Sequence, residues 1–127
     1  AFGAQAVIVP KDRAVGVNAT VAKAASGAAD TVPVVTVTNL ARAIAALKEH
    51  GVWVLGADTG GESIVDADLT GPVAWVLGAE GPGLRRLTRE SCDRIVGIPL
   101  SGAVESLNIA TAVGVVAAEF WRQHRRG

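Results

Sequence analysis

Apolar, β-branched runs recur along the chain and predict five buried strands. They cover residues 6–10, 32–37, 52–55, 73–77 and 95–98. Each run is apolar on both faces instead of alternating with polar residues, which is typical of strands that are covered on both sides. Helical patterns lie between and after these runs, over residues 18–28, 39–50, 84–91 and 106–123. Because strand and helix alternate, the sequence predicts an α/β fold with a mainly parallel sheet flanked by helices.

The second of these helices carries clear signals at both ends. Asn39 is a good N-cap residue, and Gly51 is placed to close the C-terminus. Leu40, Ile44 and Leu47 fall on one face, as expected for a helix that packs against a sheet. We therefore expect this helix to be part of the scaffold.

The last predicted helix is small and apolar nearly all round. Its small residues are Ala110, Ala112, Gly114, Ala117 and Ala118. Such a helix is expected to be buried on more than one side. A sheet face can cover one side, and a second copy of the same helix in a homodimer would cover the other. An ordinary central helix in a tightly packed monomer is the alternative.

Composition narrows the class of protein. The chain has 127 residues, which fits one domain over 1–127, and its 12 basic and 12 acidic residues give no overall attraction to polyanions. The single Cys92 cannot form an intramolecular disulfide, and no Cys/His cluster has zinc spacing, so we expect a cytoplasmic protein without a metal. No apolar run approaches the ~20 residues that span a bilayer, so no membrane partner is expected.

Two segments depart from the scaffold pattern, and each follows a predicted strand. Residues 77–84 contain three glycines and a proline, where backbone amides can approach a ligand closely. Residues 98–108 leave a strand through a glycine turn and place Ser106 and Asn108 in the first turn of the last helix. Helix capping would explain Ser106 but explains Asn108 less well. The carboxyl ends of strands are where open α/β sheets bind ligands.

The glycine spacing argues against two common nucleotide sites. A phosphate-binding Walker loop needs Lys and Ser/Thr after its last glycine, whereas Leu84 and Arg85 follow here. The order G-x-x-G-x-G also differs from the G-x-G-x-x-G of dinucleotide-binding domains. A nicotinamide dinucleotide domain is therefore disfavoured.

Taken together, the sequences LGAEGPGL at 77–84 and IPLSGAVESLN at 98–108 resemble motifs two and three of the SpoU, or TrmH-like, class of SPOUT RNA methyltransferases. Weaker agreement extends upstream through residues 25–29 and 32–35, so the resemblance covers essentially the whole chain. This upstream part is most similar to the bacterial enzymes that methylate a guanosine ribose in 23S rRNA. It implies an RNA ribose 2′-O-methyltransferase with a deep trefoil knot at the C-terminal end of the sheet. S-adenosylmethionine is the implied cofactor, and no metal is needed.

The resemblance also implies which residues surround the cofactor. Carried over by position, they are Gly78, Ile98 and Leu107, with Ala57, Ala79, Gly81 and Leu100 close by. These residue types suit the ligand, because adenine needs an apolar slot with backbone hydrogen bonds, and glycine allows a close approach.

The catalytic residues are implied less completely. A ribose 2′-hydroxyl is a weak nucleophile at neutral pH, so it needs a positioned base or strong electrostatic help. Asn108, Glu80 and Ser106 match the polar positions of motifs two and three and are predicted to be catalytic, although Glu80 could instead be a solvated loop carboxylate. The family's first motif, an Asn followed by an Arg, would precede Ala1. We therefore expect a chain truncated at its N-terminus that lacks this strand and its catalytic Arg.

Basic residues near the second motif are candidates for RNA contacts. Arg85 and Arg86, with Arg89 and Arg94 nearby, are placed where the family faces RNA, and Lys23 is a weaker candidate. An exposed face balanced by neighbouring acidic residues is an equally good explanation. A tRNA ribose 2′-O-methyltransferase, or a non-catalytic knotted module for RNA binding or dimerisation, remains an alternative function.

Overall fold

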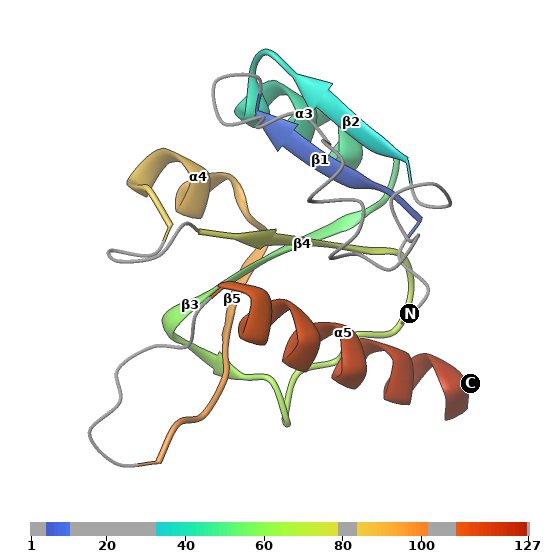
Figure 1. Ribbon diagram of the computed structural model, residues 1–127, viewed down its shortest axis with the longest axis vertical. Helices are drawn as coiled ribbons and strands as arrows, with labels where there is room; N and C mark the ends of the chain where they lie inside the picture. The colour runs from blue at the N-terminus through green and yellow to red at the C-terminus, as the bar shows by residue number, and fades with distance from the viewer. Residues whose placement is uncertain (1–4, 11–32, 79–83, 102–108, 127) are drawn as a thin grey trace, which may run out of the picture. The chain divides into compact units, whose positions relative to one another are not determined.

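The computed structural model describes residues 5–10, 33–78, 84–101 and 109–126 (Figure 1). Within these ranges it contains five strands and three helices, and every strand pairing is parallel. The predicted α/β class with parallel strands is therefore confirmed. The predicted helix at 18–28 lies outside the described residues. The chain divides into two compact units, Ala1–Ala43 and Ile44–Gly127.

The first unit contains a two-stranded sheet. β1 (Val7–Pro10) pairs with β2 (Val34–Val37), with Val7 opposite Val34. The prediction that these strands are buried is wrong, because Val7 and Val35 are each 45% exposed. A two-stranded sheet offers little surface with which to cover its own side chains. The apolar runs thus predicted the strands correctly but not their burial.

α3 (Leu40–Glu49) has the ends that the sequence predicts. The Asn39 side-chain oxygen accepts a hydrogen bond from the Arg42 amide at 3.1 Å, which is an N-cap contact. At the other end, Gly51 has a φ of 81°, the left-handed conformation that favours glycine. Ile44, on the apolar face of the helix, is 2% exposed.

The second unit contains a three-stranded sheet in the order β4–β3–β5. Its strands are β3 (Trp53–Ser63), β4 (Val73–Leu77) and β5 (Arg94–Gly97). β3 is much longer than predicted, because it pairs with β5 as far as Ala57, makes an excursion over residues 58–61, and pairs with β5 again at Glu62 and Ser63. The turn-forming sequence Asp-Thr-Gly-Gly of this excursion concealed the continuation.

β3 is covered on both faces, as predicted. On one face, Leu55 belongs to a core with Val96 and Val116, and Val116 is contributed by α5 (Ile109–Arg126). On the other face, Val54 is fully buried. α5 therefore lies against one face of this sheet (Figure 1).

Polar side chains fix the C-terminal half of α5 to the loop after β3. Gln123 accepts a hydrogen bond from the Leu69 amide at 2.8 Å and donates one to the Ala67 carbonyl at 2.9 Å. His124 Nε2 lies 2.8 Å from the Gly71 carbonyl oxygen.

Within the described ranges, no helix is long and apolar enough to cross a membrane.

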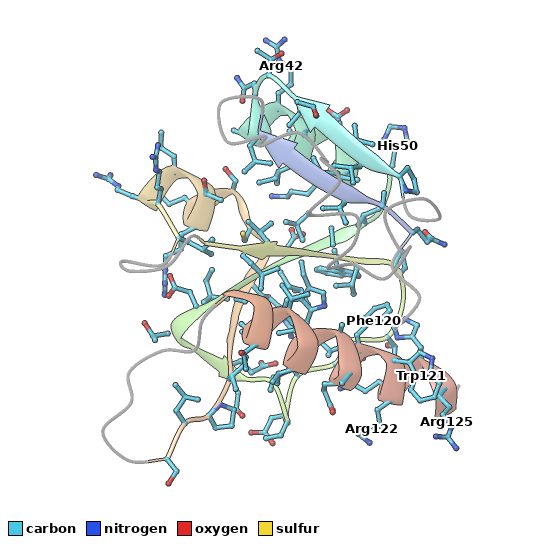
Figure 2. All side chains as sticks on the ribbon, viewed as in Figure 1. Arg42, His50, Phe120, Trp121, Arg122 and Arg125 are labelled. Atoms are coloured by element: carbon cyan, nitrogen blue, oxygen red, sulfur yellow. The ribbon has the colours of Figure 1, made fainter. Side chains whose placement is uncertain are left out.

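Several apolar side chains of α5 are exposed in the part of the chain that the structure describes. Val113, Val115 and Trp121 are 42%, 36% and 45% exposed, and Figure 2 shows Trp121 near the C-terminal end of the helix. Among the described residues, α5 buries Val116 in the core of the sheet, whereas the sequence predicts burial on more than one side.

Candidate functional site

The carboxyl ends of β4 and β5, and the residue of β3 at which its pairing with β4 ends, bring three predicted cofactor residues to one edge of the sheet. Ala57 is the register partner of both Leu77 in β4 and Val96 in β5. Gly78 follows Leu77 directly, and Ile98 lies two residues after Val96. Residues far apart in the sequence therefore meet at the edge where parallel sheets bind ligands.

A cavity of about 280 Å³ opens beside this edge. Two segments line it, and they include the predicted residues Ile98 and Leu100. The full lining is Thr59, Gly60, Gly61, Ser63, Gly97, Ile98, Pro99 and Leu100. The volume is close to the lower limit of small-molecule sites, which is roughly 300 Å³. The lining combines glycine backbone and hydroxyl-bearing residues with apolar side chains, a combination that can hold a flat heterocycle and hydrogen-bond its edges.

The part of this lining between Thr59 and Ser63 is a site feature that sequence reasoning missed. Gly61 lies so close to β5 that a Cβ atom there would collide with the carbonyl oxygen of Ile95. Gly60 has a φ of 82°, which also favours glycine. A pair of glycines two residues after an apolar run was the available signal, since glycine at such a place marks close backbone approach.

Asp58 begins the β3 excursion and joins it to α4 (Arg86–Ser91). Its carboxylate accepts hydrogen bonds from the Thr59 amide at 2.8 Å, the Leu84 amide at 3.3 Å and the Arg89 guanidinium at 2.8 Å. Arg89 also donates to the Thr59 carbonyl at 3.0 Å. Arg89 is therefore committed to an internal ion pair.

The other basic residues of this region are more exposed. Arg86 has a side chain that is 88% exposed and lies 3.1 Å from the Glu90 carboxylate, one helical turn away. Arg85 precedes α4 in an extended conformation, and Arg94 is exposed at the start of β5. Arg86 thus fits the alternative explanation of an exposed face balanced by acidic residues, since Glu90 pairs with it. Lys23 lies outside the described residues.

The remaining predicted site residues cannot be placed on this edge. The catalytic candidates Glu80, Ser106 and Asn108 lie outside the described residues, as do the cofactor candidates Ala79, Gly81 and Leu107. Their roles stay predictions that rest on the family resemblance.

Cys92 lies on the face of the β4–β3–β5 sheet that is turned away from α5, and its side chain is suited to packing. Its thiol donates to the Thr88 carbonyl at 3.3 Å, and a Cβ on Gly56 would lie 3.0 Å from its sulfur. Burial raises the pKa of this thiol, with the Asp93 carboxylate adding to the effect, so the thiol stays protonated at neutral pH. Among the residues that the structure describes, no group of His, Cys, Asp or Glu is arranged to hold a metal ion.

Comparison with known protein families accounts for the two motifs at this edge. The model of the SpoU rRNA Methylase family matches residues 1–118. The chain belongs to the SpoU rRNA methylase family. This confirms the family resemblance that the sequences at 77–84 and 98–108 indicated.

Two relatives show where this SpoU chain lies within the family. It is 60% identical over 124 residues to the 23S rRNA (guanosine-2′-O-)-methyltransferase RlmB of Ralstonia nicotianae, covering 97% of the chain and 50% of the relative. It is 57% identical over 125 residues to RlmB of Nitrosomonas europaea, covering 98% of the chain and 48% of the relative. The chain spans about half the length of the curated relatives it matches.

Solved structures of SpoU enzymes share the fold. The SpoU methyltransferase AviRb of Streptomyces viridochromogenes, crystallised with AdoMet, superposes with a TM-score of 0.87 at 28% identity, over 99% of this chain and 50% of that one. A TrmH-family protein from Porphyromonas gingivalis superposes with a TM-score of 0.86 at 32% identity, over 96% and 50%. The parallel α/β arrangement is therefore that of the SpoU enzymes.

Proposed function

We propose that residues 1–127 form the catalytic domain of an S-adenosylmethionine-dependent methyltransferase that acts on the ribose 2′-hydroxyl of a guanosine in 23S rRNA. The observation that carries this proposal is the 60% identity, over 97% of the chain, to an enzyme named for that reaction. The register that brings Ala57, Gly78 and Ile98 to one sheet edge supports it, because the family resemblance assigns all three residues to the cofactor.

The cavity beside this edge fits part of S-adenosylmethionine. Ile98 and Leu100 give an apolar wall, and Gly60 and Gly61 contribute backbone to the same lining. Ala57 and Gly78 would complete the site, with Ala79, Gly81 and Leu107 in the adjoining motifs. When bound, S-adenosylmethionine supplies a sulfonium methyl group to an acceptor oxygen.

The chain's polar motif residues would prepare that acceptor. Asn108 and Ser106 can hydrogen-bond the ribose hydroxyls, and Glu80 can orient the acceptor hydroxyl or accept its proton. Alignment of the hydroxyl is as important as its deprotonation, because methyl transfer requires the acceptor oxygen in line with the bond that breaks. Arg85, Arg86 and Lys23 would contact phosphates of the RNA.

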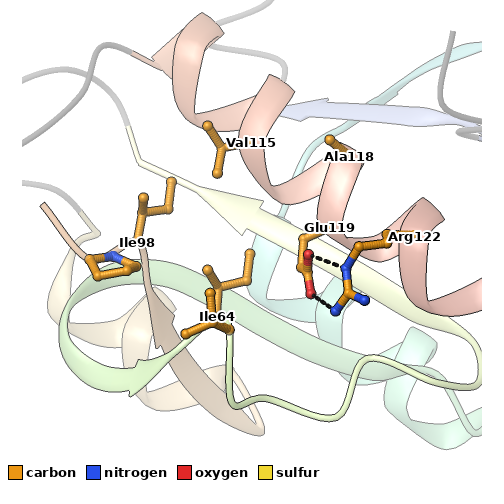
Figure 3. A pocket seen from close by; sticks show the side chains of 8 residues that line it. Ile64, Ile98, Val115, Ala118, Glu119 and Arg122 are labelled. Atoms are coloured by element: carbon orange, nitrogen blue, oxygen red, sulfur yellow. Dashed lines mark hydrogen bonds and ion pairs between the residues drawn. The ribbon is translucent and has the colours of Figure 1, made fainter.

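The proposal includes a trefoil knot at this edge and a homodimer formed through α5. A hollow of about 430 Å³ lies between α5 and the segments around Ile64 and Ile98, with Val115 and Ala118 on its helix side (Figure 3). Val65 on its rim is 65% exposed. Contiguous apolar surface of this kind favours a protein partner, and a second copy of α5 is the partner we propose.

Methyl transfer to defined RNAs tests this function. The protein should transfer labelled methyl groups from S-adenosylmethionine to 23S rRNA, and the mapped product should be a guanosine 2′-O-methyl group. Asn108→Ala should lower the rate by about a hundredfold or more, as expected for loss of a group that acts in the transition state. Methylation of tRNA alone would favour the tRNA enzyme, and cofactor-free RNA binding would favour the non-catalytic module.

A further inference from the structure

Asp58 is a charged residue in the second unit whose position calls for a functional explanation. Its side chain is only 13% exposed. One carboxylate oxygen accepts from the Thr59 amide, and the other accepts from both the Leu84 amide and the Arg89 guanidinium. A carboxylate so far removed from water is tolerated because these donors replace its hydration.

Asp58 and its neighbour in β3 meet both ends of the second motif segment. At the start of the segment, Leu77 is paired in register with Ala57. At its end, the Leu84 amide donates to Asp58 at 3.3 Å. Two consecutive residues of β3 therefore contact the chain where the segment leaves β4 and where it leads into α4.

Arg89 extends this link to the cavity lining. Its second nitrogen donates to the Thr59 carbonyl at 3.0 Å, and a Cβ on Gly60 would lie 3.4 Å from the same nitrogen. Thr59 and Gly60 both line the cavity of about 280 Å³. The ion pair thus connects α4, the end of the second motif and one wall of the cavity.

We propose that Asp58 and Arg89 are a pair of positioning residues that set the distance between this cavity wall and the second motif, and that they thereby determine affinity for S-adenosylmethionine. This inference rests on the proposed function. Neither side chain needs to touch the cofactor, because the carboxylate acts through the backbone at Thr59 and Leu84.

Isothermal titration of the 127-residue chain with S-adenosylmethionine tests the pair. Asp58→Asn keeps the shape of the side chain but replaces one carboxylate oxygen with an NH₂ group. This group cannot accept a hydrogen bond from the N–H donors that surround Asp58. We expect the Kd to rise about tenfold, the effect of losing one charge-assisted hydrogen bond. Arg89→Lys keeps the charge but loses the two-point contact, and should raise the Kd by a smaller factor.

Asp68→Asn is the matched control. The Asp68 carboxylate accepts hydrogen bonds from the Thr70 amide at 3.0 Å and the Thr70 hydroxyl at 2.6 Å, within one exposed loop. This variant removes the same charge from the same unit, and its Kd should equal that of the wild type. The double variant Asp58→Asn/Arg89→Lys should bind no more weakly than Asp58→Asn alone, because the two residues act as one unit.

The outcomes separate this inference from the proposed function. A wild-type Kd in Asp58→Asn, measured on folded protein, would overturn the positioning role while leaving cofactor binding intact. Multiplicative effects in the double variant would also overturn it, since they would mean two independent structural losses. If Asp58→Asn does not fold, Arg89→Lys is the deciding variant. A raised Kd would support the positioning role, and an unchanged Kd would overturn it. Failure of the wild type to bind S-adenosylmethionine would instead refute the proposed function.

Discussion

The β1–β2 sheet and the β4–β3–β5 sheet are built from similar valine-rich strands, and they differ in how much of that apolar surface is covered. Val7 and Val35 in the first sheet are each 45% exposed, whereas Val54 and Leu55 in β3 are 0% and 2% exposed. β3 has a paired strand on each side and packed residues on both faces. Burial therefore depends on the number of neighbouring elements and not on the apolar run itself.

The number of neighbouring strands also decides where a sheet can offer an edge that binds a ligand. In the second unit, the carboxyl ends of β4 and β5 lie on either side of the central strand β3 and bring Gly78 and Ile98 together with Ala57. A pair of strands supplies only two ends and no central strand. The following predictions test this contrast between the two sheets.

The largest expected effect is loss of a buried side chain from the central strand. Leu55→Ala should lower the free energy of unfolding by about 3 kcal/mol, since it removes packing and leaves a cavity. Val35→Ala in the exposed sheet should lower it by less than about 1 kcal/mol. Urea unfolding of both variants gives the two values. Equal losses would show that the two sheets do not differ in packing as described.

A methyl group added at Gly61 should come next in size. Gly61→Ala places a Cβ against the Ile95 backbone carbonyl, so the excursion must shift. We expect a loss of about 2 kcal/mol in the free energy of unfolding. The matched control is Gly114→Ala in α5, where a Cβ meets nothing within 4 Å. That variant should be neutral or more stable by up to about 1 kcal/mol, because alanine favours the helix.

Cys92 should make a smaller, pH-dependent contribution to the free energy of unfolding. Burial raises the pKa of its thiol in the folded chain above the ordinary value of 9.0. The folded state then holds the proton more tightly than the unfolded state, so this contribution to stability is complete below the unfolded pKa and is lost as pH rises through the folded pKa. The pH dependence of iodoacetamide alkylation should show a higher midpoint in native protein than in urea. Coincident midpoints would contradict it.

The smallest stability effect is expected on the exposed face of α4. Arg86→Ala breaks an ion pair whose partners are 88% and 58% exposed, and should change the free energy of unfolding by about 0.3 kcal/mol. The same change should weaken RNA binding measurably if Arg86 contacts phosphate, and should reduce the salt dependence of binding. Thermal unfolding and RNA titration at two salt concentrations separate the two effects. RNA affinity equal to that of the wild type would remove Arg86 from the interface.

Much of the second unit could be predicted from its sequence. β4 and β5 follow from local signals, as does the capped start of α3 in the first unit. The family resemblance assigned Ala57, Gly78 and Ile98 to one cofactor site, and their register brings them to one edge of the sheet. The extent of β3 could not be predicted, because its excursion uses turn-forming residues and is held by contacts with a distant strand. Asp58 was missed for the same reason, since its partners Leu84 and Arg89 are 26 and 31 residues away in the sequence.

Titration of the wild-type chain and Gly78→Val with S-adenosylmethionine tests the central claim most directly. If the cofactor binds beside Ala57, at the carboxyl ends of β4 and β5, the wild type should bind saturably. Gly78→Val should not bind, because a branched side chain would occupy the approach that glycine leaves open. Gly114→Ala serves as the folded control, and NAD should give no binding. Equal binding by Gly78→Val and the wild type, or binding of NAD alone, would contradict the assignment of this edge.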